Sequence, residues 1–129
     1  MPHFHIDYSG NIETHVDISG LCEVVRSAAA SLDTFPTAGV RVRALRVDHY
    51  AIADGNPEHG FVDISVRLRA GRPMNVKEDA VKVLFEAAQA YLSEFMENHS
   101  LAISLEMRDI DPALSPKTGN IRDYLKAQT

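Results

Sequence analysis

The sequence of 129 residues is 45% hydrophobic and 24% charged, with 13 basic against 18 acidic residues and a net charge of -5. These values are typical of one globular domain spanning residues 1–129, and they exclude a largely disordered chain. No apolar run approaches the roughly 18 to 20 residues that span a bilayer, so we expect no membrane partner. A single cysteine, Cys22, excludes a disulfide within the chain. No signal peptide is visible, and the expected location is the cytoplasm.

The basic residues are unevenly placed along this acidic chain. Residues 40–72 contain six arginines and no lysine, and this stretch carries a net charge of +2. The acidic balance of the whole chain argues against a nucleic-acid partner, whereas arginine is suited to bidentate recognition of carboxylates and phosphates. We therefore expect a small anionic ligand. The six residues are Arg41, Arg43, Arg46, Arg67, Arg69 and Arg72.

The first half of the chain predicts a strand, a helix and a strand. Alternating apolar residues predict a strand over residues 4–8, and apolar spacings of three and four predict a helix over residues 18–32, capped by Asp17 or Ser19. Cys22 lies on the apolar side of that helix and is expected in the core. Alternation over residues 40–53 predicts a long strand. Its phase changes at Ala44 and Leu45, which indicates a β-bulge or a bend.

The second half repeats this layout with different residues. A strand is predicted over residues 61–69, a helix with Asn75 as N-cap and Glu78 completing a capping box, and a strand over residues 101–108. A short helix is expected over residues 121–126. The order β-α-β-β-α-β predicts an α+β fold with a four-stranded mixed sheet and two helices on one face. The other face carries arginines and small residues, and it is expected to meet a partner subunit.

Pro2 is the most specific chemical feature of the sequence. Methionine is usually removed when the following residue is small, which leaves Pro2 with a secondary amine; if Met1 stays, Pro2 is an amide and has no basic nitrogen. The ordinary pKa of an α-amine is about 7.7 to 8.0. Nearby arginine charge and partial burial both lower the pKa of an amine. We therefore expect Pro2 to act as a general base near neutral pH.

Two arginines are expected to bind the ligand, because they lie beside loops at strand ends. Arg41 follows the turn over residues 35–39, and Arg72 follows the strand over residues 61–69. The other four arginines are expected to form ion pairs, with Asp48, Asp63 or Glu106 or with a neighbouring subunit. His3, His5 and Asp7 share one strand face, but one strand rarely supplies three converging zinc ligands, so no metal is expected. No serine–histidine or cysteine–histidine pair stands out.

Together these segments resemble one family within the tautomerase superfamily, the 5-carboxymethyl-2-hydroxymuconate Δ-isomerases. The resemblance extends from Pro2 to about Tyr124. It rests on the motifs Pro2-His3-Phe4-His5-Ile6-Asp7-Tyr8-Ser9-Gly10-Asn11-Ile12, Phe35-Pro36-Thr37-Ala38-Gly39-Val40-Arg41, Ala53-Asp54-Gly55 and Ala70-Gly71-Arg72.

The resemblance implies a homotrimer with its sheets inside and its helices outside. It also implies a cofactor-free isomerase that moves a double bond in a small carboxylated dienol during homoprotocatechuate breakdown. The family's proline base falls on Pro2, and its substrate-binding arginines fall on Arg41 and Arg72. Two other interpretations stay open: a tautomerase acting on a different keto–enol acid, and a non-catalytic ferredoxin-like module that binds small molecules.

Overall fold

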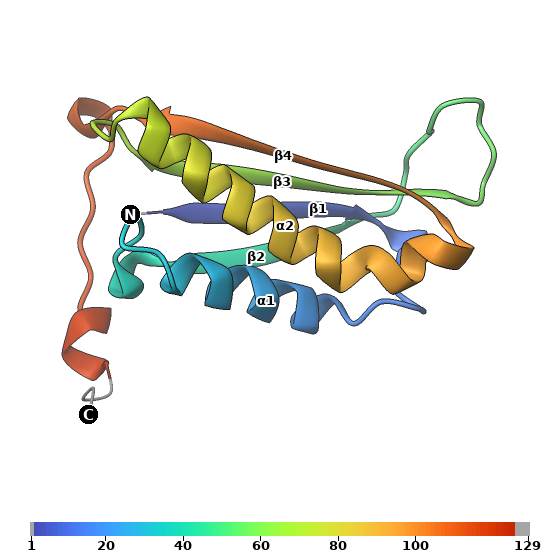
Figure 1. Cartoon of the computed structure of the whole chain (residues 1–129), viewed down its shortest axis with the longest axis horizontal. Helices are drawn as coiled ribbons and strands as arrows, with labels where there is room; N and C mark the ends of the chain where they lie inside the picture. The colour runs from blue at the N-terminus through green and yellow to red at the C-terminus, as the bar shows by residue number, and fades with distance from the viewer. Residues whose placement is uncertain (1, 126–129) are drawn as a thin grey trace.

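A computed structural model describes residues 2–125 of the chain, which form one four-stranded sheet with two helices packed on it (Figure 1). In chain order the elements are β1 (His3–Ser9), η1 (Gly10–Ile12), α1 (Ile18–Ala30), η2 (Thr37–Gly39), β2 (Arg41–Val47), β3 (His59–Arg69), α2 (Met74–Asn98), β4 (Ser100–Ile110), η3 (Pro112–Leu114) and η4 (Ile121–Tyr124), where η denotes a 3-10 helix. The expected β-α-β-β-α-β order is confirmed. Among the described residues, no helix is both long enough and apolar enough to cross a membrane.

The sheet has the strand order β2-β1-β3-β4 and is mixed, as expected. β1 pairs parallel with β2 and antiparallel with β3, and β3 pairs parallel with β4. The two parallel pairs each need a crossover helix, which α1 and α2 supply. Both helices lie on the same face of the sheet (Figure 1), so the other face, called the free face below, has no covering element from residues 2–125.

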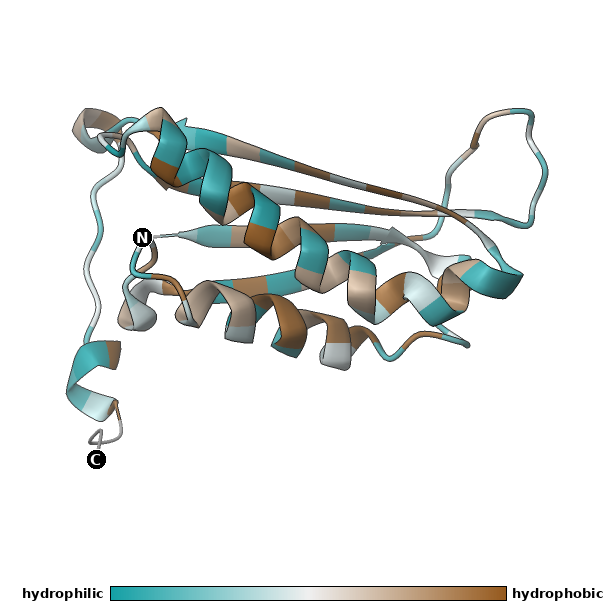
Figure 2. Cartoon of the chain, viewed as in Figure 1, coloured by the Kyte–Doolittle hydropathy of each residue, from teal (hydrophilic) through white to brown (hydrophobic). Residues whose placement is uncertain are grey.

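The core lies between the sheet and the two helices. Strand residues alternate, so Phe4, Ile6 and Tyr8 point into the core while His3 and His5 lie on the free face. Phe35, from the loop after α1, packs edge-on against Phe4 with ring centroids 5.2 Å apart. Figure 2 shows hydrophobic and hydrophilic residues interspersed along both helices, and the helix residues packed into the core are hydrophobic. The buried helix residues are Leu21, Val25, Ala29, Ala80, Leu84, Ala88 and Leu92.

The predicted length and bulge of the second strand are wrong. β2 ends at Val47, and its register with β1 runs without a break from Arg41 to Val47. The strand ends there because β1, its single described partner, ends at Ser9, opposite Val47. Ala44 and Leu45 alternate normally, and Leu45 lies on the free face, where it is 50% exposed. The two adjacent apolar residues therefore reflect an exposed leucine and not a bend in the strand.

Of the two predicted helix caps, one is confirmed and one is wrong. Asp17 caps α1, because its carboxylate accepts a hydrogen bond from the backbone N–H of Gly20 at 3.2 Å. The N-cap of α2 is Pro73, two residues before the predicted Asn75, so the helix begins at Met74, and no side chain makes a capping hydrogen bond. The carbonyl of Pro73 accepts a hydrogen bond from the backbone N–H of Lys77 at 3.2 Å, so the helical hydrogen bonds begin two residues before Asn75. The C-terminal helix is a 3-10 turn, Ile121–Tyr124, and its predicted end at residue 126 lies outside the described residues.

Gly20 allows the two helices to be joined by a hydrogen bond. The Tyr91 hydroxyl of α2 donates to the backbone carbonyl of Asp17 at 2.8 Å, at the start of α1. A Cβ atom placed on Gly20 would overlap that hydroxyl. The absence of a side chain at this position therefore fixes how the N-terminus of α1 meets α2.

We expect Gly20→Ala to lower the melting temperature, because overpacking costs about 1 to 3 kcal/mol and exceeds the gain in helix propensity of about 1 kcal/mol. Tyr91→Phe removes the hydroxyl, so Gly20→Ala should cost much less in that background. Thermal unfolding of the two single variants and the double variant measures the difference. Equal costs in both backgrounds would contradict the contact.

Candidate active site

The residues predicted to form a site lie at one end of the sheet. This end holds the beginnings of β1 and β2 and the ends of β3 and β4, and Figure 1 shows the N-terminus there, next to the C-terminal segment. Pro2 directly precedes β1 and is buried. Arg41 is the first residue of β2 and pairs with His3, the residue after Pro2. The parallel register thus brings Pro2 and Arg41 together from distant parts of the chain.

Arg72 reaches the same end, where its guanidinium holds two backbone segments together. Its Nε donates to the carbonyl of Thr34 and its Nη1 to the carbonyl of Arg69, both at 3.0 Å. Arg72 therefore connects the loop after α1 to the end of β3. It is half-buried, and no described carboxylate lies within ion-pair distance of it.

A small cavity lies on the free face at this end of the sheet. It has a volume of about 120 Å³, and polar or charged side chains from three separate segments line it. His3 comes from β1, Arg67 and Arg69 from β3, and Lys117 from the segment after β4. Ile110, Pro112, Ser115 and Pro116 complete its wall.

This environment favours the neutral form of His3 at neutral pH. Partial burial lowers the pKa of its imidazole, and the positive charges of Arg67, Arg43 and Arg41 lower it further. Arg43 Nη1 lies 3.4 Å from His3 Nδ1, and since a guanidinium is only a donor, Nδ1 must accept. The neutral ring therefore carries its proton on Nε2, where it is a hydrogen-bond donor.

Comparison with known proteins identifies the family. A sequence model described as 5-carboxymethyl-2-hydroxymuconate isomerase matches residues 2–125. The chain is 33% identical over 126 residues to the 5-carboxymethyl-2-hydroxymuconate Delta-isomerase of Escherichia coli, covering 98% of this chain and 100% of that protein. The chain belongs to the 5-carboxymethyl-2-hydroxymuconate isomerase family.

Solved structures of family members have the same fold. A crystal structure of a 5-carboxymethyl-2-hydroxymuconate delta-isomerase has a TM-score of 0.89 and 28% identity, covering 100% of this chain and 96% of the other. The isomerase from Deinococcus radiodurans R1 has a TM-score of 0.87 and 29% identity, covering 97% and 95%. Native fused 4-OT, at 20% identity and a TM-score of 0.68, shares the fold alone. The expected tautomerase fold is confirmed.

The expected ion pairs of the remaining arginines are confirmed at one position. Arg46 pairs with Asp48 at 2.7 Å and also with Glu13. Within residues 2–125, Arg43, Arg67 and Arg69 form no ion pair, and Asp63 instead accepts a hydrogen bond from Ser104 at 2.7 Å. Alternation along the predicted strand already placed Arg67 and Arg69 on the face away from the apolar residues. No sequence signal connected Lys117 to them.

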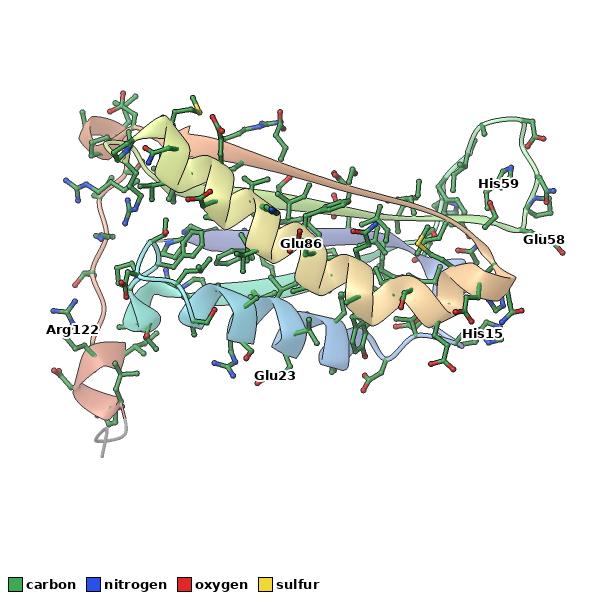
Figure 3. The ribbon with its side chains drawn as sticks, viewed as in Figure 1. His15, Glu23, Glu58, His59, Glu86 and Arg122 are labelled. Carbon is green, nitrogen blue, oxygen red and sulfur yellow. The ribbon has the colours of Figure 1, made fainter. Side chains whose placement is uncertain are left out.

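The structure does contain a serine–histidine pair that sequence reasoning missed. His59 Nδ1 lies 2.6 Å from Ser100 Oγ, and His59 Nε2 lies 2.8 Å from Asp54 Oδ1. His59 is the first residue of β3, and Figure 3 shows it beside the loop that joins β2 to β3, at the end of the sheet opposite Arg122 and the C-terminal segment. The parallel register of β3 and β4 sets His59 opposite Ser100. The hydrogen bonds from Asp54 through His59 to Ser100 therefore hold the loop against β4.

We expect His3→Gln to flatten the pH dependence of stability. The pKa of His3 lies below its ordinary 6.5 in the folded state, so below about pH 6.5 the unfolded chain binds the extra proton. The free energy of unfolding therefore falls on acidification in the wild type, and by less in the variant. Urea unfolding at pH 7.0, 6.0 and 5.0 measures the slopes. Identical slopes would show that His3 is not held neutral.

Proposed function

We propose that this protein converts 5-carboxymethyl-2-hydroxymuconate to its keto isomer, with Pro2 as the general base. The observation that carries the proposal is the position of Pro2. It lies at the start of the central strand, with Arg41 beside the next residue and an arginine-lined cavity on the adjoining face. Family membership supports the reaction class, since the matching relatives are named as isomerases of this compound.

The proposed reaction moves one proton and relocates one double bond, and it changes no oxidation state. The neutral amine of Pro2 removes the proton of the 2-hydroxyl group in the dienol. The resulting dienolate then takes a proton back from Pro2 at a distal carbon, which leaves a ketone at position 2. Burial of Pro2 and the positive charge of Arg41 favour the neutral amine, so a base is available near pH 7.

Arg41 and Arg72 have complementary parts in this proposal. A guanidinium binds a carboxylate through two parallel hydrogen bonds and stabilises negative charge as it develops on the dienolate. Arg41 is half-buried and forms no described ion pair, so its charge is free for a ligand. Arg72 uses two N–H groups on backbone carbonyls, which fixes its orientation and leaves its other N–H groups for a substrate carboxylate.

We propose a homotrimer as the working form, with the free faces directed inward. That face is uncovered by the described helices, and Leu45 on it is 50% exposed. Leu114 and Tyr124 of the C-terminal segment are each 79% exposed and also lack a covering element. A fused 4-OT protein with this fold, 16% identical, has been solved as a symmetric trimer. In such a ring, the site at the end of one sheet adjoins the next subunit.

A different keto–enol acid remains the alternative substrate. Assay of the processed protein against a panel of 2-hydroxydienoates decides between the two, with the highest kcat/KM expected for 5-carboxymethyl-2-hydroxymuconate. A higher kcat/KM for another dienoate would show that this other compound is the substrate, while the proposed reaction class would stand.

We expect Pro2→Ala to lower kcat at least tenfold. A positioned base contributes about 10²- to 10⁴-fold, and the primary amine that remains has a different basicity and a freer backbone. Steady-state kinetics of protein shown by mass spectrometry to lack Met1 measure the effect. In the wild type, the acidic limb of kcat/KM should report a pKa below about 7.7.

The controls for this variant are Pro57→Ala and sedimentation. Pro57 is exposed in the loop at the opposite end of the sheet, so its replacement should leave kcat unchanged. Pro2→Ala should sediment at three times the subunit mass, as should the wild type. If fully processed Pro2→Ala protein turns over substrate at the wild-type rate, Pro2 is not the base. If a monomer is fully active, the trimer is not the working form.

We expect Arg41→Ala and Arg72→Ala each to lower kcat/KM at least tenfold, because a hydrogen bond to a charged group contributes about 1.5 to 3 kcal/mol. Only Arg72→Ala should also lower the melting temperature, since it leaves the carbonyls of Thr34 and Arg69 without a donor. Arg26→Ala, on the exposed side of α1 and paired with Glu23, is the control. Unchanged kcat/KM in Arg41→Ala would exclude it from substrate binding.

A further inference from the structure

A row of basic side chains crosses the free face of the sheet beside Pro2. The register places Arg41 of β2 and Arg67 of β3 on either side of His3, and Arg108 of β4 opposite Arg67. Neighbouring strands lie about 4.8 Å apart, and like charges directly opposite each other destabilise a sheet. Among the described residues of this row, Arg108 alone has a carboxylate partner, Glu106 at 2.7 Å. The row therefore holds positive charge that residues 2–125 leave unneutralised.

Apart from Glu106, which pairs with Arg108, the described acidic residues of β1 and β3 on the free face lie away from this row. Asp7 and Asp63 pair with each other farther along β1 and β3, toward the opposite end of the sheet. His5 hydrogen-bonds Asp7 at 2.9 Å, and Ser104 hydrogen-bonds Asp63 at 2.7 Å. These carboxylates are thus already engaged with neighbours, so they do not neutralise the basic row.

The cavity described above adjoins this row, since His3 and Arg67 line it, and it has room for only part of a ligand. Its volume of about 120 Å³ is well below the roughly 300 Å³ of a pocket that encloses a whole small molecule. Arg67, Arg69 and Lys117 bring three positive charges to it, and neutral His3 brings a hydrogen-bond donor at Nε2. Several cationic donors around so small a space are suited to a single anionic group.

We propose that this cavity, lined by Arg67, Arg69 and Lys117 beside His3, binds a third carboxylate of the substrate. The inference rests on the proposed function, because it concerns the same substrate. A muconate skeleton carries two carboxylates, and a carboxymethyl branch adds the third. Arg41 and Arg72 serve the first two, and the cavity makes the site selective for tricarboxylates over dicarboxylates.

Binding of two inert acids tests this selectivity without any turnover. Propane-1,2,3-tricarboxylate and glutarate share a five-carbon chain and differ by the middle carboxylate. Isothermal titration calorimetry at fixed ionic strength should show the tricarboxylate binding at least tenfold more tightly to the wild type. Arg67→Gln and Arg69→Gln should each reduce that preference about tenfold, and Arg26→Gln should leave it unchanged.

Kinetics with two dienols provide the second readout. The substrate pair is 5-carboxymethyl-2-hydroxymuconate and 2-hydroxymuconate, which lacks the branch. Arg67→Gln and Arg69→Gln should raise KM about tenfold for the branched compound, with kcat within twofold. Neither variant should change KM for the unbranched compound, since the lost contact is absent from it.

The two measurements separate failure of this inference from failure of the proposed function. If the protein prefers the tricarboxylate in a way that depends on Arg67 but has no isomerase activity, the carboxylate site is supported and the proposed function is contradicted. If the protein is an isomerase but Arg67→Gln and Arg69→Gln leave its substrate preference unchanged, the proposed function is supported and the carboxylate site is overturned. A lower melting temperature in Arg67→Gln with unchanged selectivity would also overturn it, and would assign the basic row to contact between subunits.

Discussion

The pairing of β1 with two neighbours of opposite direction is the constraint on which the rest of the structure depends. β1 runs parallel to β2 and antiparallel to β3, so the start of β1 meets the start of β2 and the end of β3. Residues 2, 41 and 67–72 are thereby gathered at one end of the sheet. Every element of the proposed chemistry, from the base to the arginines, follows from this register.

A second consequence follows from placing both helices on one face. Each helix returns the chain to start a strand parallel to the one it left, and both bury their apolar residues against the same face of the sheet. The hydrophobic effect therefore determines the residues of that side, whereas the free face is available for charges. On the free face, arginines gather near Pro2, and Asp7 and Asp63 lie toward the other end.

The concentration of arginine near Pro2 has opposite effects on stability and on chemistry. Like charges in one row repel each other, which costs stability in the unliganded subunit. Together with partial burial, which is the larger cause, the same charges lower the pKa of His3 and so favour its neutral form. They also attract a polyanionic ligand, whose binding offsets the repulsion. A site of this kind is expected to be least stable when empty.

Local sequence patterns determined most of the fold and part of the site. Alternation and helical periodicity predicted all four strands and both long helices, because burial of one side imposes those periods directly. Pro2, Arg41 and Arg72 were proposed from their positions beside breaks in the pattern. The errors fell where a local pattern does not decide the outcome: the end of β2 depends on the length of β1, and Pro73 rather than Asn75 is the N-cap of α2.

The sequence alone could not determine which residues, distant along the chain, lie close together in space. Arg67 and Arg69 resembled ordinary surface charges in the sequence, and Lys117 lies in a tail with no periodic pattern. The structure sets them around one cavity with His3 because strand register and the path of the chain after β4 are properties of the whole sheet. The same holds for Ser100 and His59, whose contact follows from parallel pairing across 41 positions of sequence. Periodicity depends on near neighbours and can be found in the sequence, whereas register depends on long-range packing, which only the tertiary structure decides.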